Sequence, residues 1–270
     1  MIISEKEAQH FKHAIAVPGF GLAMQEKLKM SRVLVIGAGG LGSPVIQYLG
    51  ASGVGIIGIA DYGVINDEDM PRQPIYHVQD VKKHKAKMAG SRLYGVNPFA
   101  RPFPLLLQAK PETMAFLLDG FDIVVDCTQH QPSHLLINDA CILHDKPLVV
   151  GEVHNWLAWY GGFNMPMPDG TRSASYRCAQ DLTDDYRNYD AGALGVTHGA
   201  TGMRIATDVI KYLIDVPIGL TNKLYGIDYL HNTTTVHDLT PNREAMEAVK
   251  ANGLLSADDY GLEIVPDVED

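Results

Sequence analysis

The chain has 270 residues, which suits one large domain or two small ones. Its 46% hydrophobic and 20% charged residues are typical of a globular protein with a core and exclude a disordered chain. A net charge of −10 argues against non-specific nucleic-acid binding, and no uncharged apolar stretch is long enough to span a membrane. The charged N-terminus does not resemble a secretory signal, and three cysteines are too few for a disulfide scaffold. We therefore expect a cytoplasmic protein with neither a nucleic-acid nor a membrane partner.

Predicted helices and strands alternate along the chain. Residues 5–30 read as helical pieces joined by a loop at 17–21. Continuous apolar runs predict strands buried on both faces at 33–36, 55–61, 121–128 and 146–153. Helical spacing of apolar residues predicts helices at about 43–50, 80–95, 132–143 and 208–213.

The last part of the chain follows a different pattern. Residues 223–239 predict a hairpin at a sheet edge, and residues 243–251 predict an amphipathic helix followed by an acid-rich tail. The whole order predicts an α/β fold: a doubly wound, Rossmann-like, mostly parallel sheet with flanking helices and an antiparallel edge extension.

A glycine-rich turn follows the first predicted strand and opens a helix. The glycines are Gly37, Gly39, Gly40 and Gly42, in the pattern G-x-G-x-x-G. Such a turn brings backbone N–H groups and a helix N-terminus close to an anion. Asp61 ends the next strand 19 residues after Gly42, near the spacing of a carboxylate that binds ribose hydroxyls. From these residues alone the ligand could be NAD, FAD or ATP.

Positive side chains follow Asp61 and favour a ligand with a longer phosphate tail. Arg72 and Lys85 lie within one connection of the ribose anchor and could reach such a tail. We interpret Lys82, Lys83 and Lys87 as a solvated basic helix face.

Several motifs occur together along the chain. They are RVLVIGAGGLGSPVIQYLGASGVGIIGIAD at 32–61, Arg72-Gln73, Lys85, Asn97-Pro98, VVDCT at 124–128 and AGALGVTHGATGMRIATDVIKYL at 191–213. In combination they resemble the MoeB/ThiF/HesA family, the prokaryotic relatives of ubiquitin-activating E1 enzymes. The resemblance covers roughly residues 5–240. It divides the chain into an E1-like nucleotide-binding domain at 1–240, whose residues 1–30 are a helical arm, and a C-terminal helix with its acidic tail at 241–270.

The resemblance implies an enzyme that uses ATP and Mg²⁺ to adenylate a carboxylate. The carboxylate belongs to the C-terminus of a small ubiquitin-like sulfur carrier or a peptide, pyrophosphate leaves, and the enzyme is usually a homodimer. Carried over by position, the nucleotide-binding residues are Gly37, Gly39, Gly40, Gly42, Asp61, Arg72, Gln73 and Lys85. The catalytic candidates are Arg72, Lys85, Gln129 and His130.

The chain departs from the family pattern at the expected reaction centre. Gln129 replaces the aspartate that holds the metal, and a neutral amide is a poor ligand for Mg²⁺. Glu68 and Asp69 are acids where the family has neutral residues facing the triphosphate, which should weaken ATP binding. His13 and His134 replace family arginines.

Two further family features are missing from the sequence. Residues 186–190 contain no cysteine where some members carry a reactive one. Cys178 stands alone where a zinc-binding pair would begin, so we predict no structural zinc and assign no metal ligands.

Histidines offer an alternative chemistry. His130, His134, His154 and His198 could gather near the pocket for proton transfer or metal binding, or they could be unrelated, and Glu152 is a further candidate base. The leading hypothesis is ATP-dependent adenylation. The alternatives are a divergent E1-like scaffold that binds a nucleotide or partner without adenylation, and a repurposed histidine-containing site.

Overall fold

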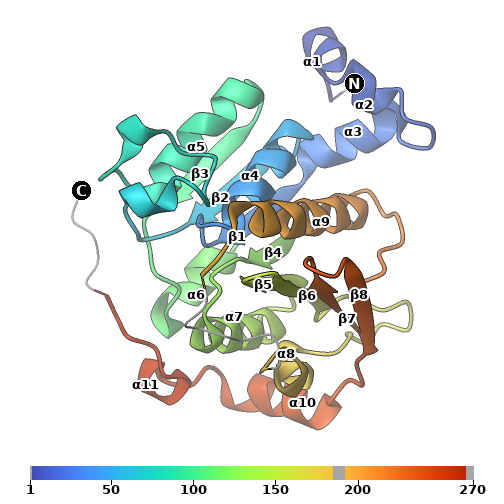
Figure 1. The fold of residues 1–270 in the computed structure, drawn as a ribbon. Coiled ribbons are helices and arrows are strands. Elements are labelled where there is room, and N and C mark those ends of the chain that lie inside the picture. The colour runs from blue at the N-terminus through green and yellow to red at the C-terminus, as the bar shows by residue number, and fades with distance from the viewer. Residues whose placement is uncertain (1, 185–191, 266–270) are drawn as a thin grey trace.

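The computed structural model describes residues 2–184 and 192–265. Its centre is an eight-stranded sheet in the order β3-β2-β1-β4-β5-β6-β7-β8 (Figure 1). The strands are β1 (Arg32–Ile36), β2 (Ile56–Ala60), β3 (Arg101–Leu105), β4 (Ile123–Asp126), β5 (Leu148–His154), β6 (Leu157–Phe163), β7 (Lys223–Asp228) and β8 (Thr233–Asp238). The five strands from β3 to β5 are parallel, and β6, β7 and β8 extend the sheet antiparallel.

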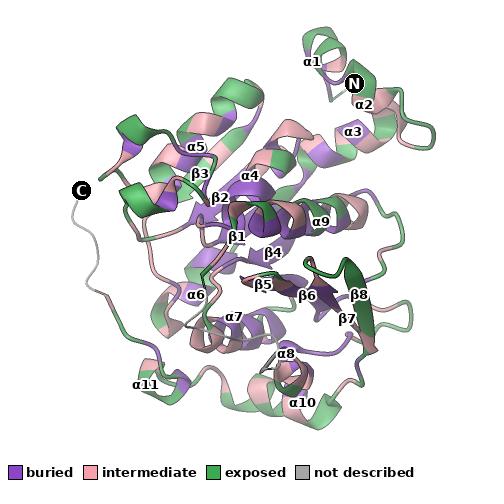
Figure 2. Cartoon of the chain, in the orientation of Figure 1, coloured by how far each residue is buried: buried purple, intermediate pink, exposed green. Residues whose placement is uncertain are grey.

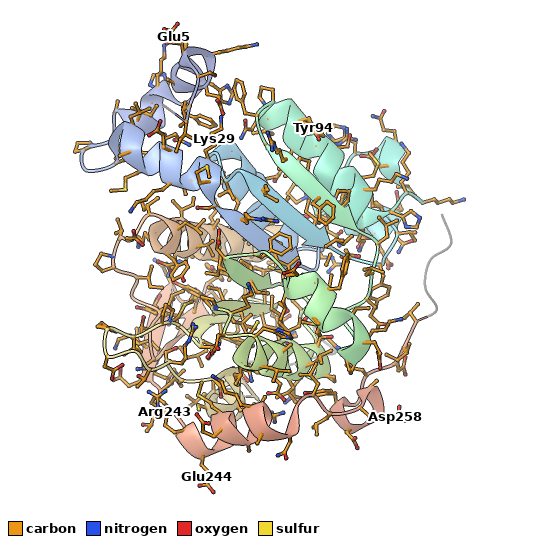
Figure 3. The ribbon with its side chains drawn as sticks, turned by 180° about the vertical axis from the view of Figure 1, so that it is seen from behind. Glu5, Lys29, Tyr94, Arg243, Glu244 and Asp258 are labelled. Carbon is orange, nitrogen blue, oxygen red and sulfur yellow. The ribbon has the colours of Figure 1, made fainter. Side chains whose placement is uncertain are left out.

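Helices cover both faces of the sheet (Figure 1). One layer holds α3 (Gly21–Met30), α4 (Gly42–Ala51), α5 (Lys85–Val96) and α9 (Gly195–Leu213). The other holds α6 (Pro111–Leu118), α7 (Gln131–Leu143), α8 (Gln180–Asp184), α10 (Arg243–Asn252) and α11 (Ala257–Tyr260). The short helices α1 (Glu5–His10) and α2 (Lys12–Ile15) project from one end. Seen from behind, Glu5 on this arm and Arg243 and Asp258 on the second layer lie at opposite ends of the molecule (Figure 3).

The central strands are apolar because both of their faces are covered. Val33, Val35 and Val125 pack under α4 and α9, whereas Leu34 and Val124 pack against the α6–α7 layer. Figure 2 accordingly shows burial concentrated in the middle strands and exposure on the outer helix faces. This double burial explains why the sequence shows continuous apolar runs.

The predicted fold class is confirmed, including the antiparallel edge extension. One predicted helix boundary needs correction. Helix α5 begins at Lys85 and not near 80, because the Asp80 carboxylate accepts the N–H of His77 and closes a short 3₁₀ turn. The sequence prediction missed α6 and the edge strand β3. The predicted helical segment at 208–213 lies within α9, which begins earlier, at Gly195.

The topology places a ligand crevice at the carboxyl ends of β1 and β4. These strands are neighbours in the sheet, but the chain continues from β1 to β2 on the other side of β1. The crevice where the strand order reverses in this way is the usual ligand site of doubly wound sheets. Within residues 2–184 and 192–265 no helix combines the length and apolar character that crossing a bilayer requires.

Candidate functional site

The glycine turn is shaped by close backbone packing against the end of β4. Gly37 has a φ of +93°, and a Cβ there would lie 2.8 Å from the carbonyl carbon of Cys127. A Cβ on Gly42 would lie 1.9 Å from the carbonyl oxygen of Gly37. Any larger side chain at either position would therefore push the turn off the sheet.

Gly39 faces open space instead. The nearest atom to a Cβ at this position would be Nε2 of Gln73, 3.8 Å away. The turn leads directly into α4, whose first N–H groups have no partner within the helix. Space and a helix N-terminus together suit a bound phosphate.

Asp61 links the end of β2 to this turn. Its carboxylate accepts the N–H of Ala38 and the N–H of Gly63, each at 2.7 Å. Burial raises the pKa of the Asp61 carboxyl, and the two amide donors oppose that rise. Carboxylate oxygens have about four lone-pair sites, so two remain for ligand hydroxyls.

These elements surround a cavity of about 720 Å³, within the usual range for ligand pockets. Of the residues we predicted for nucleotide binding, seven line it: Gly37, Gly39, Gly40, Asp61, Arg72, Gln73 and Lys85. The eighth, Gly42, shapes the turn behind the cavity. Gln129 and His130 line the cavity as well. The roles of all these residues in binding or catalysis stay predictions.

Asp69 holds the two cations expected to bind phosphates. Nζ of Lys85 lies 3.1 Å from Oδ2 of Asp69, and Nη2 of Arg72 lies 3.5 Å from Oδ1. Gln73 donates to the same Oδ1 at 2.6 Å. Asp69 is buried and lines the cavity, whereas Glu68 is exposed. A triphosphate entering the cavity would compete with Asp69 for these cations.

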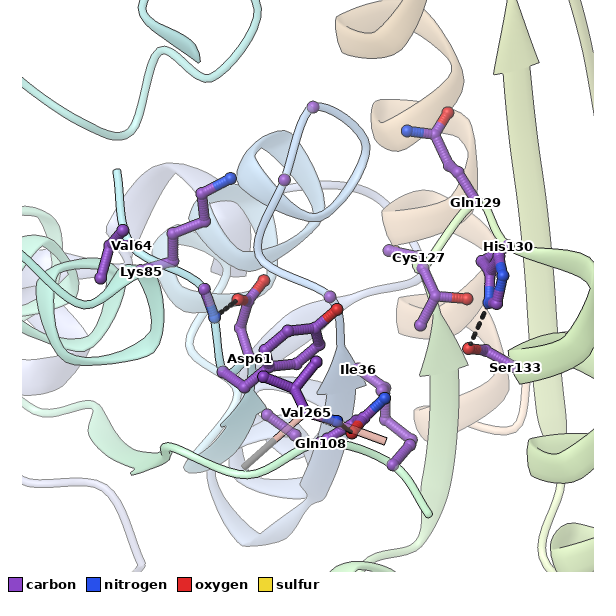
Figure 4. A pocket seen from close by; sticks show the side chains of 18 of the residues that line it. Ile36, Asp61, Val64, Lys85, Gln108, Cys127, Gln129, His130, Ser133 and Val265 are labelled. Carbon is purple, nitrogen blue, oxygen red and sulfur yellow. Dashed lines mark hydrogen bonds between the residues drawn. The ribbon is translucent and has the colours of Figure 1, made fainter. Parts of the chain in front are cut away.

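Gln129 and His130 lie across the glycine turn from Lys85 (Figure 4). Gln129 has a positive φ of 54°, and its Oε1 accepts the N–H of Val153 at 3.1 Å. The His130 ring hydrogen-bonds through Nδ1 to the Ser133 hydroxyl at 3.0 Å. Desolvation, followed by the nearby imidazole of His134, lowers the pKa of His130.

The other histidines do not gather in the cavity. Nδ1 of the buried His134 lies 2.7 Å from Asp126, and its Nε2 lies 3.8 Å from Glu152. Nε2 of His154 lies 3.1 Å from the other oxygen of Glu152. These four residues, which belong to β4, β5 and α7, form a largely buried polar cluster, and none of them lines the cavity.

His198 lies inside α9 and not in a glycine-rich segment before that helix. Its Nδ1 hydrogen-bonds to the carbonyl oxygen of Leu194 at 2.9 Å. The ring packs on the glycine turn, since a Cβ on Gly40 would lie 2.6 Å from Cδ2 of His198. Burial lowers the pKa of this imidazole, and the charge of Arg72 adds to the effect.

The remaining sequence features lie away from the cavity. His13 is exposed on α2, and Cys178 is a half-buried free thiol. Residues 186–190 lie outside the described residues. Across the described parts of the chain, no three or more His, Cys, Asp or Glu side chains are grouped to hold a metal ion.

Sequence reasoning missed one wall of the cavity. Leu107, Gln108 and Ala109 line it after β3, and Gly261, Glu263 and Val265 line it from beyond α11. Nothing in the sequence indicated this wall, because residues 253–270 read as an acid-rich tail.

Comparison with known proteins identifies relatives of this arrangement. The ThiF family matches residues 11–248. The sulfur carrier protein adenylyltransferase of Thermus thermophilus is 32% identical over 231 residues, which cover 84% of this chain and 85% of that protein. The probable adenylyltransferase/sulfurtransferase MoeZ of Mycobacterium tuberculosis is 32% identical over 235 residues, but this chain covers only 59% of MoeZ.

Solved structures share the fold at lower identity. MccB of E. coli, solved with ATP, superposes with a TM-score of 0.75 at 21% identity, covering 90% of this chain and 74% of MccB. PaaA superposes with a TM-score of 0.75 at 17% identity, covering 89% of this chain and 76% of PaaA.

Proposed function

Because the chain belongs to the ThiF family, we propose that it is an E1-like adenylyltransferase. Its substrates are ATP and the C-terminal carboxylate of a small ubiquitin-like sulfur carrier or a peptide. The observation that carries the proposal is the cavity that the glycine turn, Asp61 and the cations Arg72 and Lys85 line together. The names of its relatives, which are adenylyltransferases, support the same reaction.

The proposed reaction activates a poor acylating agent. A carboxylate oxygen attacks the α-phosphorus, the bond from this phosphorus to the bridging oxygen breaks, and pyrophosphate leaves with the electron pair. The turn amides and α4 would hold the phosphates in line, and Asp61 would bind the ribose. Arg72 and Lys85 would leave Asp69 to stabilise the charge that develops on the phosphoryl oxygens and on the leaving pyrophosphate.

Mg²⁺ accompanies ATP in the reaction that the resemblance implies, but position 129 does not fit a ligand for it. The Gln129 side chain is neutral, and its oxygen already accepts the N–H of Val153. Mg²⁺ favours carboxylate oxygens. We therefore assign the ion no ligand in the chain and propose it only as a companion of the nucleotide.

The resemblance also leads us to propose a homodimer that works in the cytoplasm. A second candidate function is that of an E1-like subunit that binds a nucleotide or a partner without adenylating it. Two observations favour it: Asp69 binds both cations, and Gln129 hydrogen-bonds to β5.

Exchange of radiolabelled pyrophosphate into ATP tests the proposal, using small ubiquitin-like proteins and peptides that end in Gly-Gly as acceptors. We expect exchange that depends on the acceptor and falls at least tenfold in Lys85→Ala, which removes a cation from the phosphate end. Lys87→Ala is the matched control, since this exposed lysine of α5 does not line the cavity. Tight ATP binding without exchange would favour the second candidate, and absence of ATP binding would refute both.

A further inference from the structure

The cavity wall beyond α11 lies outside the part of the chain that matches the ThiF family, which ends at residue 248. We call residues 261–265 the strap. The strap follows α11 and passes from α7, where a Cβ on Gly261 would lie 3.9 Å from Pro132, to the segment after β3. The strap thus lies C-terminal to the matched region.

The start of the strap is fixed by a buried anchor. The Tyr260 hydroxyl donates to Oδ2 of Asp139 in α7 at 2.9 Å. Arg177 binds the same carboxylate with two donors, at 2.9 and 2.6 Å. Leu262 is 5% exposed and belongs to the core beneath the sheet. Residues on both sides of Gly261 are therefore held against the domain.

The side chain of Gln108 holds the far end of the strap. Nε2 of Gln108 donates to the carbonyl oxygen of Glu263 at 2.7 Å. The N–H of Val265 donates to Oε1 of Gln108 at 2.9 Å. The Gln108 amide thus pairs with two peptide groups of the strap as a neighbouring strand would.

Successive residues of the strap face alternately toward the cavity and away from it, as in an extended segment. Gly261, Glu263 and Val265 line the cavity, whereas Leu262 points into the core and Ile264 is 47% exposed outside the cavity. A period of two is what an extended chain along a pocket wall gives. The side of the strap at Val265 therefore faces whatever the cavity binds.

The position of Val265 indicates which part of a nucleotide it faces. Lys85 and Arg72 mark the phosphate end, and Asp61 marks the ribose. In Figure 4, Val265 and Gln108 lie beside Asp61 and Ile36, away from Gln129. Apolar side chains of Ile36, Leu107 and Val265 line this region. An apolar slot beside the ribose site suits the flat faces of a purine base.

We propose that the strap forms one wall of the base-binding site, with Val265 contacting the base and Gln108 positioning the strap. The proposal rests on the proposed use of ATP. It makes Val265 a specificity-determining residue for the nucleoside, and Gln108 a positioning residue that acts through the strap.

Calorimetric titration of Val265→Ala, Gln108→Ala and the matched control Ile264→Ala tests this, with ATP and inorganic tripolyphosphate as probes. We expect Val265→Ala to weaken ATP binding about tenfold, the low end of the effect of a lost apolar contact. Gln108→Ala should weaken it by a similar factor, because it removes both hydrogen bonds that hold the far end of the strap. Tripolyphosphate has no base, so its affinity should stay the same in all variants. Ile264→Ala should bind both probes as the unmodified chain does.

Cleavage by a glutamate-specific protease gives a second readout that does not depend on affinity. Glu263 and Ile264 are exposed, and a base seated against the strap should slow cleavage of the bond between them. ATP should protect this bond in the unmodified chain, and tripolyphosphate should not. If ATP binds normally to Val265→Ala and leaves cleavage unchanged, the strap plays no part in binding. If the unmodified chain binds tripolyphosphate but no ATP, the proposed function itself is wrong.

Discussion

Replacing Asp69 by asparagine should strengthen ATP binding. The carboxylate lies 3.1 Å from Nζ of Lys85 and 3.5 Å from Nη2 of Arg72, so it occupies the cations that a triphosphate needs. It also faces the cavity, where it would repel the phosphates directly. The side-chain amide of the Asp69→Asn variant would keep an oxygen for the N–H of Asn66, which now donates to Asp69 at 2.9 Å.

The size of the effect follows from the geometry. A phosphate oxygen that approaches Lys85 to an ordinary charged hydrogen bond of about 2.8 Å, before Lys85 turns from Asp69, lies about 6 Å from the Asp69 carboxylate. Two unit charges at that separation repel by about 3 kcal/mol at an effective dielectric constant of about 20. Asp69 also orders the side chains of Lys85 and Arg72. Losing that order in the variant cancels about 1 kcal/mol of the repulsion that is relieved. A net gain of about 2 kcal/mol is roughly thirtyfold in the dissociation constant.

Isothermal titration with ATP measures the change, and Asp67→Asn is the matched control. This control removes the same charge from the same 3₁₀ turn, but Asp67 is exposed and does not line the cavity. The gain in Asp69→Asn should shrink as salt is raised, because ions that enter the cavity screen the phosphates, although Asp69 itself is buried. An affinity of Asp69→Asn equal to or weaker than that of Asp67→Asn would refute the competition between Asp69 and the triphosphate.

Three further predictions concern the turn and its support. Asp61→Ala should weaken ATP binding at least tenfold and lower the free energy of unfolding by about 2 kcal/mol, because two backbone amides lose their acceptor; titration and chemical denaturation measure the two effects. Gly40→Ala should lower the melting temperature, because its Cβ would lie 2.6 Å from His198, and the double variant with His198→Ala should recover most of the loss. The free energy of unfolding should fall as the pH drops below about 6.5 and fall less steeply in His198→Gln. Burial lowers the pKa of His198 in the folded chain, so the unfolded chain binds this proton first; equal slopes for both proteins would contradict the assignment.

The sequence predicted the turn and its ribose anchor because their chemistry is local. The glycines from Gly37 to Gly42 follow a strand and open a helix, and Asp61 ends the next strand, so spacing alone brings them together. The structure places Ala38 and Asp61 in direct hydrogen-bond contact. The same reasoning located Arg72 and Lys85 at the cavity, although it did not foresee that Asp69 would hold both.

Other elements escaped prediction because tertiary contacts decide them. Strand β3 contains Pro102 and Pro104, which a sheet tolerates at its edge, and only the sheet order reveals that β3 is an edge strand. Helix α9 starts among glycines because Gly195 packs on the backbone of Pro71, where a Cβ would lie 2.3 Å from its carbonyl oxygen. Gly202 likewise packs on Pro44. No pattern within one segment contains such contacts.

The charges around the cavity connect these findings. Among the described residues that line it, the carboxylates of Asp61, Asp69 and Glu263 outnumber the cations of Arg72 and Lys85. Because negative charges outnumber positive ones, the cavity attracts a triphosphate weakly until Lys85 and Arg72 turn from Asp69 to the phosphates. Binding affinity for the nucleotide must then come in larger part from its neutral portion, where the strap presents Val265. The same acids that weaken the phosphate site thus make the apolar wall at the base more important for recognition.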